Sequence, residues 1–118
     1  MAAAQTTLNC KLTAGTNLEN CDVAQICSAS FDVNSVTKTI RQTDGLYTDA
    51  MVKDLTWNES TVFFSQSVPD SDKSVKYLVR SQLNRLTGEM HVRADWLYLG
   101  VAKYTLEVWQ CEVRKPLF

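Results

Sequence analysis

The sequence predicts an all-β fold, a small antiparallel barrel or sandwich of about six to eight strands with a disulfide-bearing loop near the N-terminus. Two observations favour this fold class. Apolar and polar residues alternate with a period of two along much of the chain, as in strands with one solvated face. No segment has the apolar spacing of a helix longer than one or two turns. The length of 118 residues suits a single core, so we expect residues 1–118 to form one β domain.

The alternation is clearest in residues 75–113, which we expect to form a three-stranded antiparallel meander that the rest of the chain packs around. The first two strands meet at the turn Leu86-Thr87-Gly88. The residues expected on their apolar face are Val75, Tyr77, Val79, Ser81, Leu83, Met90, Val92 and Ala94. Because polar residues occupy the other face, these two strands predict a sheet with one wet side.

The third strand of this meander has a break in its pattern. Its apolar residues that alternate with polar ones are Tyr104, Leu106 and Val108. Cys111 and Val113 fall on the opposite parity from Val108. This change of parity predicts a β-bulge near Trp109-Gln110.

The first half of the chain has weaker strand signals. The segments with strand composition or alternation are residues 5–13, 28–33, 36–42 and 61–68. Asp44-Gly45 is a turn signal that ends the third of these segments. Residues 21–27 fit a single helical turn, and residues 50–57 fit neither period cleanly.

Four cysteines in a chain of this length favour disulfides over a zinc site. Structural zinc ligands usually come in close pairs, and these cysteines are spaced too unevenly for that. The favoured pairing is Cys21–Cys27, which closes a short loop, with Cys10–Cys111, which ties the first strand to the last. The next choice is Cys10–Cys27 with Cys21–Cys111. We expect no metal.

Disulfides imply an oxidising compartment, so we expect a secreted or periplasmic protein. Residues 1–4 resemble the end of a signal-peptide cleavage region, or a mature start to which Met1 has been added. We expect neither a complete signal peptide nor a transmembrane segment. The alternative is a cytosolic start with four free thiols.

The sequence has few residues suited to catalysis, so we expect a protein that is not an enzyme and needs no cofactor. His91 is the only histidine, and it lies on the polar face of its strand. The carboxylates fall in turns or on wet faces, where nothing raises their pKa for acid–base work. The alternative is a carboxylate-dependent glycan hydrolase, with the candidate residues Asp49, Asp54, Glu89, Asp95 and Glu107.

Residues 96–99 form an apolar run without alternation, which is typical of a strand buried on both sides or of an interface. The predicted binding residues are Arg80, Arg93, Trp96, Leu97, Tyr98, Leu99 and Trp109. The competing interpretation is that these aromatic residues pack in the core. A basic sheet face of Arg80, Arg85, Arg93 and Lys103 would suit single-stranded nucleic acid. The net charge of -1 argues against nucleic acid.

Leu83-Asn84-Arg85-Leu86-Thr87-Gly88, the later Cys111, and the early group of Cys10, Cys21 and Cys27 resemble small exported bacterial proteins of uncharacterised function. The resemblance implies a periplasmic or secreted β domain and carries no functional residues. Our leading hypothesis is a non-catalytic exported domain that binds a protein partner or a small apolar ligand. The second hypothesis is the glycan hydrolase, and the third is a structural subunit that self-associates. A homo-oligomer is also compatible with the binding domain of the leading hypothesis.

Overall fold

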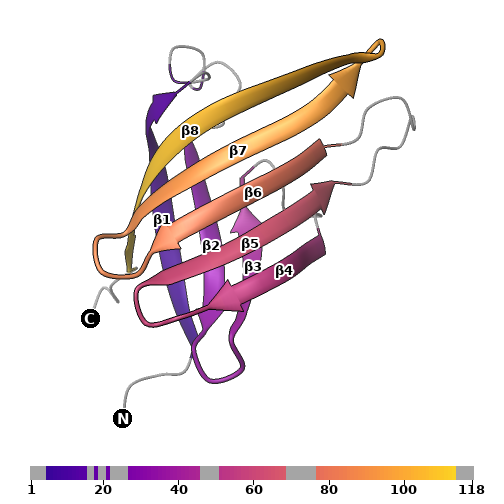
Figure 1. The fold of residues 1–118 in the computed structure, drawn as a ribbon. Coiled ribbons are helices and arrows are strands. Elements are labelled where there is room, and N and C mark those ends of the chain that lie inside the picture. Colours follow the sequence, from indigo (N-terminus) through magenta and orange to yellow (C-terminus); the bar gives the residue numbers. More distant parts are fainter. Residues whose placement is uncertain are drawn as a thin grey trace.

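A computed structural model describes residues 5–15, 18, 21, 27–45, 51–68 and 77–113 of the chain. Eight antiparallel strands form one sheet that curls into a nearly closed barrel, which confirms the predicted fold class (Figure 1). The strands are β1 Gln5–Gly15, β2 Ser28–Asn34, β3 Thr39–Asp44, β4 Met51–Trp57, β5 Thr61–Val68, β6 Tyr77–Asn84, β7 Glu89–Tyr98 and β8 Val101–Val113.

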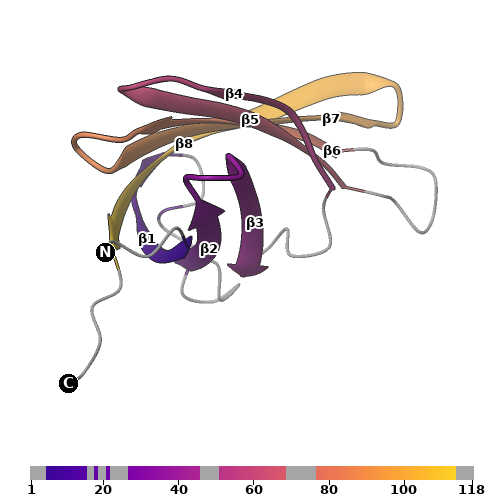
Figure 2. The ribbon, with the colours of Figure 1, turned by 90° about the horizontal axis from the view of Figure 1, so that it is seen from below.

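The strand order is β3-β2-β1-β8-β7-β6-β5-β4. Strands that follow one another in the sequence are therefore neighbours, except that β3 and β4 end the order and form no ladder with each other. The last strand, β8, pairs with the first, β1. Figure 2 shows β1–β3 lying beneath the broad curve of β4–β8, with β8 bending from one wall to the other. The result is an up-and-down barrel with one open seam.

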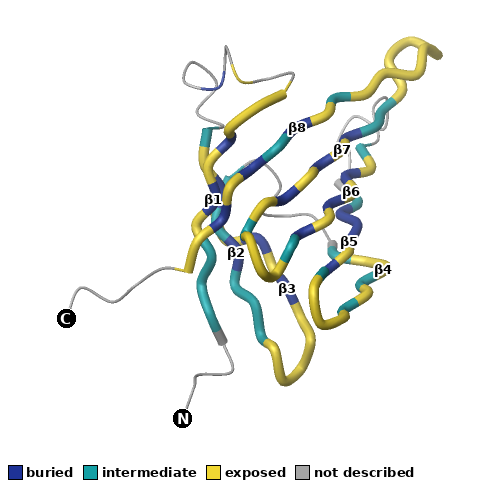
Figure 3. Tube along the Cα trace, turned by 60° about the vertical axis from the view of Figure 1, so that its left-hand side comes forward, coloured by how far each residue is buried: buried dark blue, intermediate teal, exposed yellow. Residues whose placement is uncertain are grey.

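The core fills the space between the two walls, and exposed residues lie outside and at the hairpins (Figure 3). The buried apolar residues are Cys10, Leu12, Cys21, Ala29, Phe31, Ile40, Val62, Phe64, Val79, Leu83, Met90, Val92, Ala94, Trp109 and Cys111. Phe31 of β2 meets Phe64 of β5 edge to face, with ring centroids 5.9 Å apart. Because β2 and β5 are not neighbours in the sheet, this contact joins the two walls.

Both preferred disulfides are confirmed, and the alternative pairing is wrong. Cys10–Cys111 links β1 to β8, where the two residues are direct ladder partners. Cys21–Cys27 lies before β2, and the carbonyl of Cys27 accepts a hydrogen bond of 2.9 Å from the Leu12 N–H. Cys27 is thereby tied to β1.

A pair of buried glutamine side chains lies near the open seam. The amide nitrogen of Gln66 on β5 donates a 2.8 Å hydrogen bond to Oε1 of Gln42 on β3. The amide nitrogen of Gln42 donates in turn to the carbonyl of Asp44, at 3.1 Å. Both glutamines are buried. This connection joins β3 to β5 across the side of the barrel where β3 and β4 form no ladder.

The bulge predicted near Trp109-Gln110 is wrong. From Val101 to Gln110, β8 pairs with β7 without a register shift. The shift lies in the β1–β8 ladder, between Leu12 and Ala14 of β1. As a consequence, Trp109 and Cys111 face the core together with the buried Glu107. The apolar residues of the opposite parity, Tyr104, Leu106 and Val108, lie on the outside of the barrel.

Two boundaries in the first half also differ from the sequence interpretation. The strand predicted at 36–42 begins at Thr39, because residues 35–38 form the β2–β3 turn. The Asn34 side-chain oxygen accepts from the N–H groups of Val36 and Thr37, at 3.0 and 2.9 Å, and holds this turn. Residues 50–57, left unassigned by their pattern, contain β4. A register shift between Lys53 and Thr56 explains why that strand does not alternate.

Some predictions fall on parts of the chain that the structure does not describe. Cys21 is helical, but the rest of the helical turn expected at 21–27 lies outside the described residues, apart from Cys27. Val75 also lies outside them. The turn Leu86-Thr87-Gly88 is confirmed as the β6–β7 connection.

Candidate binding surface

The outer face of β5–β8, on the solvent side of the sheet, combines apolar and charged side chains. We call it the outer face and define it by Phe63, Leu78, Arg80, Gln82, His91, Arg93, Asp95, Tyr104, Leu106 and Val108. Ladder pairing sets its rows. Arg80, Arg93 and Leu106 are successive cross-strand partners, and Leu78, Asp95 and Tyr104 form the next row. Cross-strand partners are close enough for their side chains to interact.

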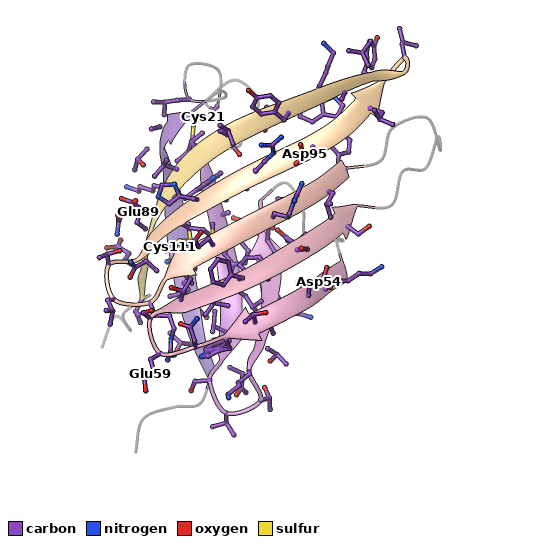
Figure 4. All side chains as sticks on the ribbon, viewed as in Figure 1. Cys21, Asp54, Glu59, Glu89, Asp95 and Cys111 are labelled. Atoms are coloured by element: carbon purple, nitrogen blue, oxygen red, sulfur yellow. A yellow bond between two sulfur atoms is a disulfide. The ribbon has the colours of Figure 1, made fainter. Side chains whose placement is uncertain are left out.

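The centre of the outer face is an ion-pair group. Asp95 Oδ2 accepts from Arg80 Nη2 at 3.2 Å, and Asp95 Oδ1 accepts from Arg93 Nε at 3.0 Å. The Arg93 guanidinium also lies 4.6 Å from the ring centroid of Tyr104, a cation–π contact. Asp95 is labelled in Figure 4, on the half of β7 that leads to the β7–β8 hairpin. Exposed ion pairs add little to stability, so what matters in this group is its arrangement, which places two arginine side chains around one carboxylate.

Apolar side chains surround this charged centre. Tyr104 and Leu106 of β8 are 57% and 51% exposed, and Phe63 of β5 is 40% exposed. An open hollow of about 530 Å³ lies over the face and is lined in part by Phe63, Arg80, Arg93, Leu106 and Val108. The face therefore has the aromatic and arginine content that is typical of protein interfaces.

The β7–β8 hairpin continues the apolar surface to its tip. The strand β7 pairs with β6 as far as Trp96, and Leu97 and Tyr98 pair with β8. At the tip Leu97, Tyr98 and Leu99 are 58%, 52% and 85% exposed. We call Leu97, Tyr98, Leu99 and Val101 the hairpin tip; it projects at the upper right of Figure 1.

The structure divides the predicted binding residues between the outer face, the hairpin tip and the core or its edge. Arg80 and Arg93 lie on the outer face, and Leu97, Tyr98 and Leu99 lie at the hairpin tip. Trp96 is partly buried and packs against Tyr77, with ring centroids 5.6 Å apart. Trp109 belongs to the core, where it is 8% exposed, and it does not reach the outer face.

Sequence reasoning missed the apolar members of the outer face, above all Phe63, Tyr104 and Leu106. The sequence did contain a sign of them. In an unbroken strand Tyr104 and Leu106 lie on the opposite face from Cys111, and a bulge in β8 is one way to explain apolar residues on both faces. The other is a strand that is apolar on both sides, and this is what the structure contains.

The carboxylates of the hydrolase hypothesis do not meet in one place among the described residues; Asp49 lies outside them. Glu107 is buried on the inside of the wall, and Asp54 is exposed on β4. Glu89 and Asp95 share the outer face of β7 but lie six residues apart, which is about 20 Å along a strand. Glu89 contacts His91 Nε2 at 2.6 Å, close to the β6–β7 turn (Figure 4). A glycosidase pair would need a separation of at most about 10 Å.

Within the described ranges, no group of three or more His, Cys, Asp or Glu residues could hold a metal ion. No helix in that part of the chain is long and apolar enough to cross a membrane. The chain matches no protein-family model, and comparison with curated proteins and with solved structures found no match either.

Proposed function

We propose that the chain is a non-catalytic exported domain that binds a protein partner through the outer face and the hairpin tip. One observation carries the proposal: two large apolar residues in the middle of β8, Tyr104 and Leu106, are exposed to solvent, while Glu107 between Leu106 and Val108 is buried. Scattered exposed apolar residues are ordinary in a monomer, but a continuous apolar strip beside arginines is typical of an interaction site.

The energetics favour a partner that covers these side chains. Full burial of one large apolar side chain contributes about 1.5–3 kcal/mol. Tyr104, Leu106 and Leu97 are 57%, 51% and 58% exposed, so about half of this free energy is available on binding. Arg80 and Arg93 outnumber Asp95, the carboxylate they share, so an acidic group on the partner would find donors here.

Export is supported by the cysteines. Both disulfides are compatible with an oxidising environment, which is the basis for proposing a secreted or periplasmic location. The two cross-links also suit a small domain that works outside the cell, where disulfides persist.

Site-specific photo-crosslinking tests the proposal in the native host. A benzophenone amino acid is placed at Leu106 in one variant and at Val36 in the control, since Val36 is 76% exposed on the β2–β3 turn. We expect a discrete product with another protein from position 106 and none from position 36. In a further variant the benzophenone amino acid replaces Tyr98. Adding Leu106→Ser to that variant should abolish its crosslinked product.

Two outcomes would contradict the proposal. The same products from both positions would mean nonspecific contact. A product with twice the mass of the chain would favour the self-associating subunit instead.

A further inference from the structure

We infer that the end of the barrel opposite the hairpin tip binds a small amphiphile, namely a single carboxylic acid with an aliphatic or aromatic body. This site is separate from the outer face and goes beyond the proposed function. It lies where the β2–β3, β4–β5 and β6–β7 hairpins surround the start of β1 and the end of β8, at the lower end of Figure 1. A cavity of about 380 Å³ opens there.

The cavity has an apolar floor. The apolar side chains of this floor are Leu8, Val33, Trp57, Val62 and Leu83. Val62 and Leu83 are direct cross-strand partners and are almost fully buried, and Trp57 pairs with Val62 from the other side. Leu8 and Val33 add partly buried walls from β1 and β2. Such a floor suits a hydrocarbon or ring without polar groups.

The rim supplies one positive charge in a fixed position. The Arg85 guanidinium lies 5.2 Å from the ring centroid of Trp57, and its Nη1 donates a 2.7 Å hydrogen bond to the Asn58 carbonyl. These contacts hold Arg85 but use few of its five N–H donors. No carboxylate of the described residues lies within ion-pair distance of Arg85. The ion pairs among those residues involve Arg80, His91 and Arg93, which lie on the outer face.

Other polar groups at the rim are already engaged or carry the opposite charge. The Asn84 side-chain oxygen accepts from the N–H groups of Leu86 and Thr87, at 2.9 and 3.1 Å. Glu112 is the rim carboxylate, and it is exposed at the end of β8. An anionic ligand would therefore be attracted by Arg85 and opposed by Glu112, which gives two substitutions with opposite expected effects.

The volume limits the ligand. Small-molecule pockets span about 300–1,000 Å³, and this cavity is near the lower limit. A medium-length alkyl chain or one ring system fits this range. A carboxylate at the head would receive charge-assisted hydrogen bonds from Arg85 while the body lies against Leu83 and Trp57.

The probes are decanoate below its micellar range and decanol below its solubility limit, and the full chain is followed by isothermal titration calorimetry and methyl NMR. We expect saturable binding of decanoate with shifts at the methyl groups of Val62 and Leu83. Arg85→Gln should weaken decanoate binding about tenfold or more, because it removes a charged donor. Glu112→Gln should strengthen it, and neither substitution should change decanol binding.

Arg41→Gln is the matched control, since Arg41 is an exposed arginine on β3 that does not line this cavity. It should leave decanoate affinity unchanged. Absence of saturable decanoate binding would overturn the inference, and so would equal losses in Arg85→Gln and Arg41→Gln. Leu106→Ser should bind decanoate as the unmodified chain does, so failure of this site and failure of the partner-binding proposal are distinguishable.

Discussion

Cys10 on β1 and Cys111 on β8 are direct partners in the antiparallel ladder that joins the first strand to the last, and a disulfide links them. The bond connects residues 101 positions apart. It therefore cross-links the barrel at the pairing that is most distant in sequence. Pairing of this kind carries the largest loop-closure entropy, so the cross-link acts where the chain gains most from it.

Removing this disulfide should cost more stability than removing the other. In the chain-entropy model a loop of about 100 residues corresponds to about 4.7 kcal/mol, and the short Cys21–Cys27 loop corresponds to about 2 kcal/mol. We expect the double variant Cys10→Ala/Cys111→Ala to unfold at a much lower urea midpoint than Cys21→Ala/Cys27→Ala. If Cys10→Ala/Cys111→Ala is already unfolded without urea, it is still the less stable of the two variants, as expected. Equal midpoints would contradict it.

The buried glutamine pair near the seam gives a second prediction. Gln66→Leu leaves Oε1 of Gln42 buried without its donor, which should cost about 1–3 kcal/mol of unfolding free energy. The double variant Gln42→Leu/Gln66→Leu should cost less than the sum of the single variants, because neither partner then remains unsatisfied. Chemical denaturation of the four proteins measures this coupling.

Gln82→Leu is the control for the glutamine pair. Gln82 is exposed on the outer face of β6, and its replacement should change stability by less than about 0.5 kcal/mol. Strictly additive losses in the Gln42 and Gln66 variants would show that the hydrogen bond adds nothing to the stability of the seam.

Much of the fold was predictable because β6 and β7 each have one wet and one dry face. Val79, Leu83, Met90 and Val92 were assigned to the apolar face by alternation alone, and all are buried. The cysteine pairing also followed from simple arguments. In these strands the residues that the local pattern marks as apolar are the ones that the fold buries. Where the local pattern and the fold agree in this way, the structure can be predicted from the sequence.

The remaining elements depend on information that no local pattern contains. The inward side of β8 is set by its register with β7 and β1, and the irregularity that accommodates it lies in β1, between Leu12 and Ala14. The outer face therefore could not be assembled from β8 alone. The break in alternation at residues 96–99 made Leu97, Tyr98 and Leu99 binding candidates, and their role in binding stays a prediction. The cavity at the barrel end was not predictable, because Trp57 and Arg85 come from different hairpins.

Two glycines with the same φ angle should respond differently to substitution by alanine. Gly88 and Gly100 both have φ of +80°. A Cβ on Gly88 would clash with the carbonyl oxygen of Cys111, whereas nothing lies within 4 Å of a Cβ on Gly100. Both substitutions incur the left-handed penalty of about 1–2 kcal/mol, and Gly88→Ala adds a backbone clash. Thermal unfolding should show a clearly larger loss for Gly88→Ala, and equal losses would contradict the packing of the β6–β7 turn on β8.

The tip of the β7–β8 hairpin should gain stability when its leucine is replaced. Tyr98 and Val101 are partners, so Leu99 and Gly100 form a two-residue turn, and their φ values of +51° and +80° are those of a type I′ turn. Asn-Gly is the preferred sequence for this turn, and a leucine at positive φ is strained. Leu99→Asn should therefore raise the free energy of unfolding by about 1 kcal/mol.

If the hairpin tip contacts a partner, the same substitution should weaken the complex, because Leu99 is the most exposed side chain at the tip. The two readouts are thermal unfolding and the photo-crosslinking yield from position 106. Leu86→Asn is the comparison, since Leu86 is similarly exposed on the β6–β7 turn, away from the hairpin tip and the outer face. A gain in stability with an unchanged yield would remove Leu99 from the binding surface. A loss of stability would contradict the turn geometry itself.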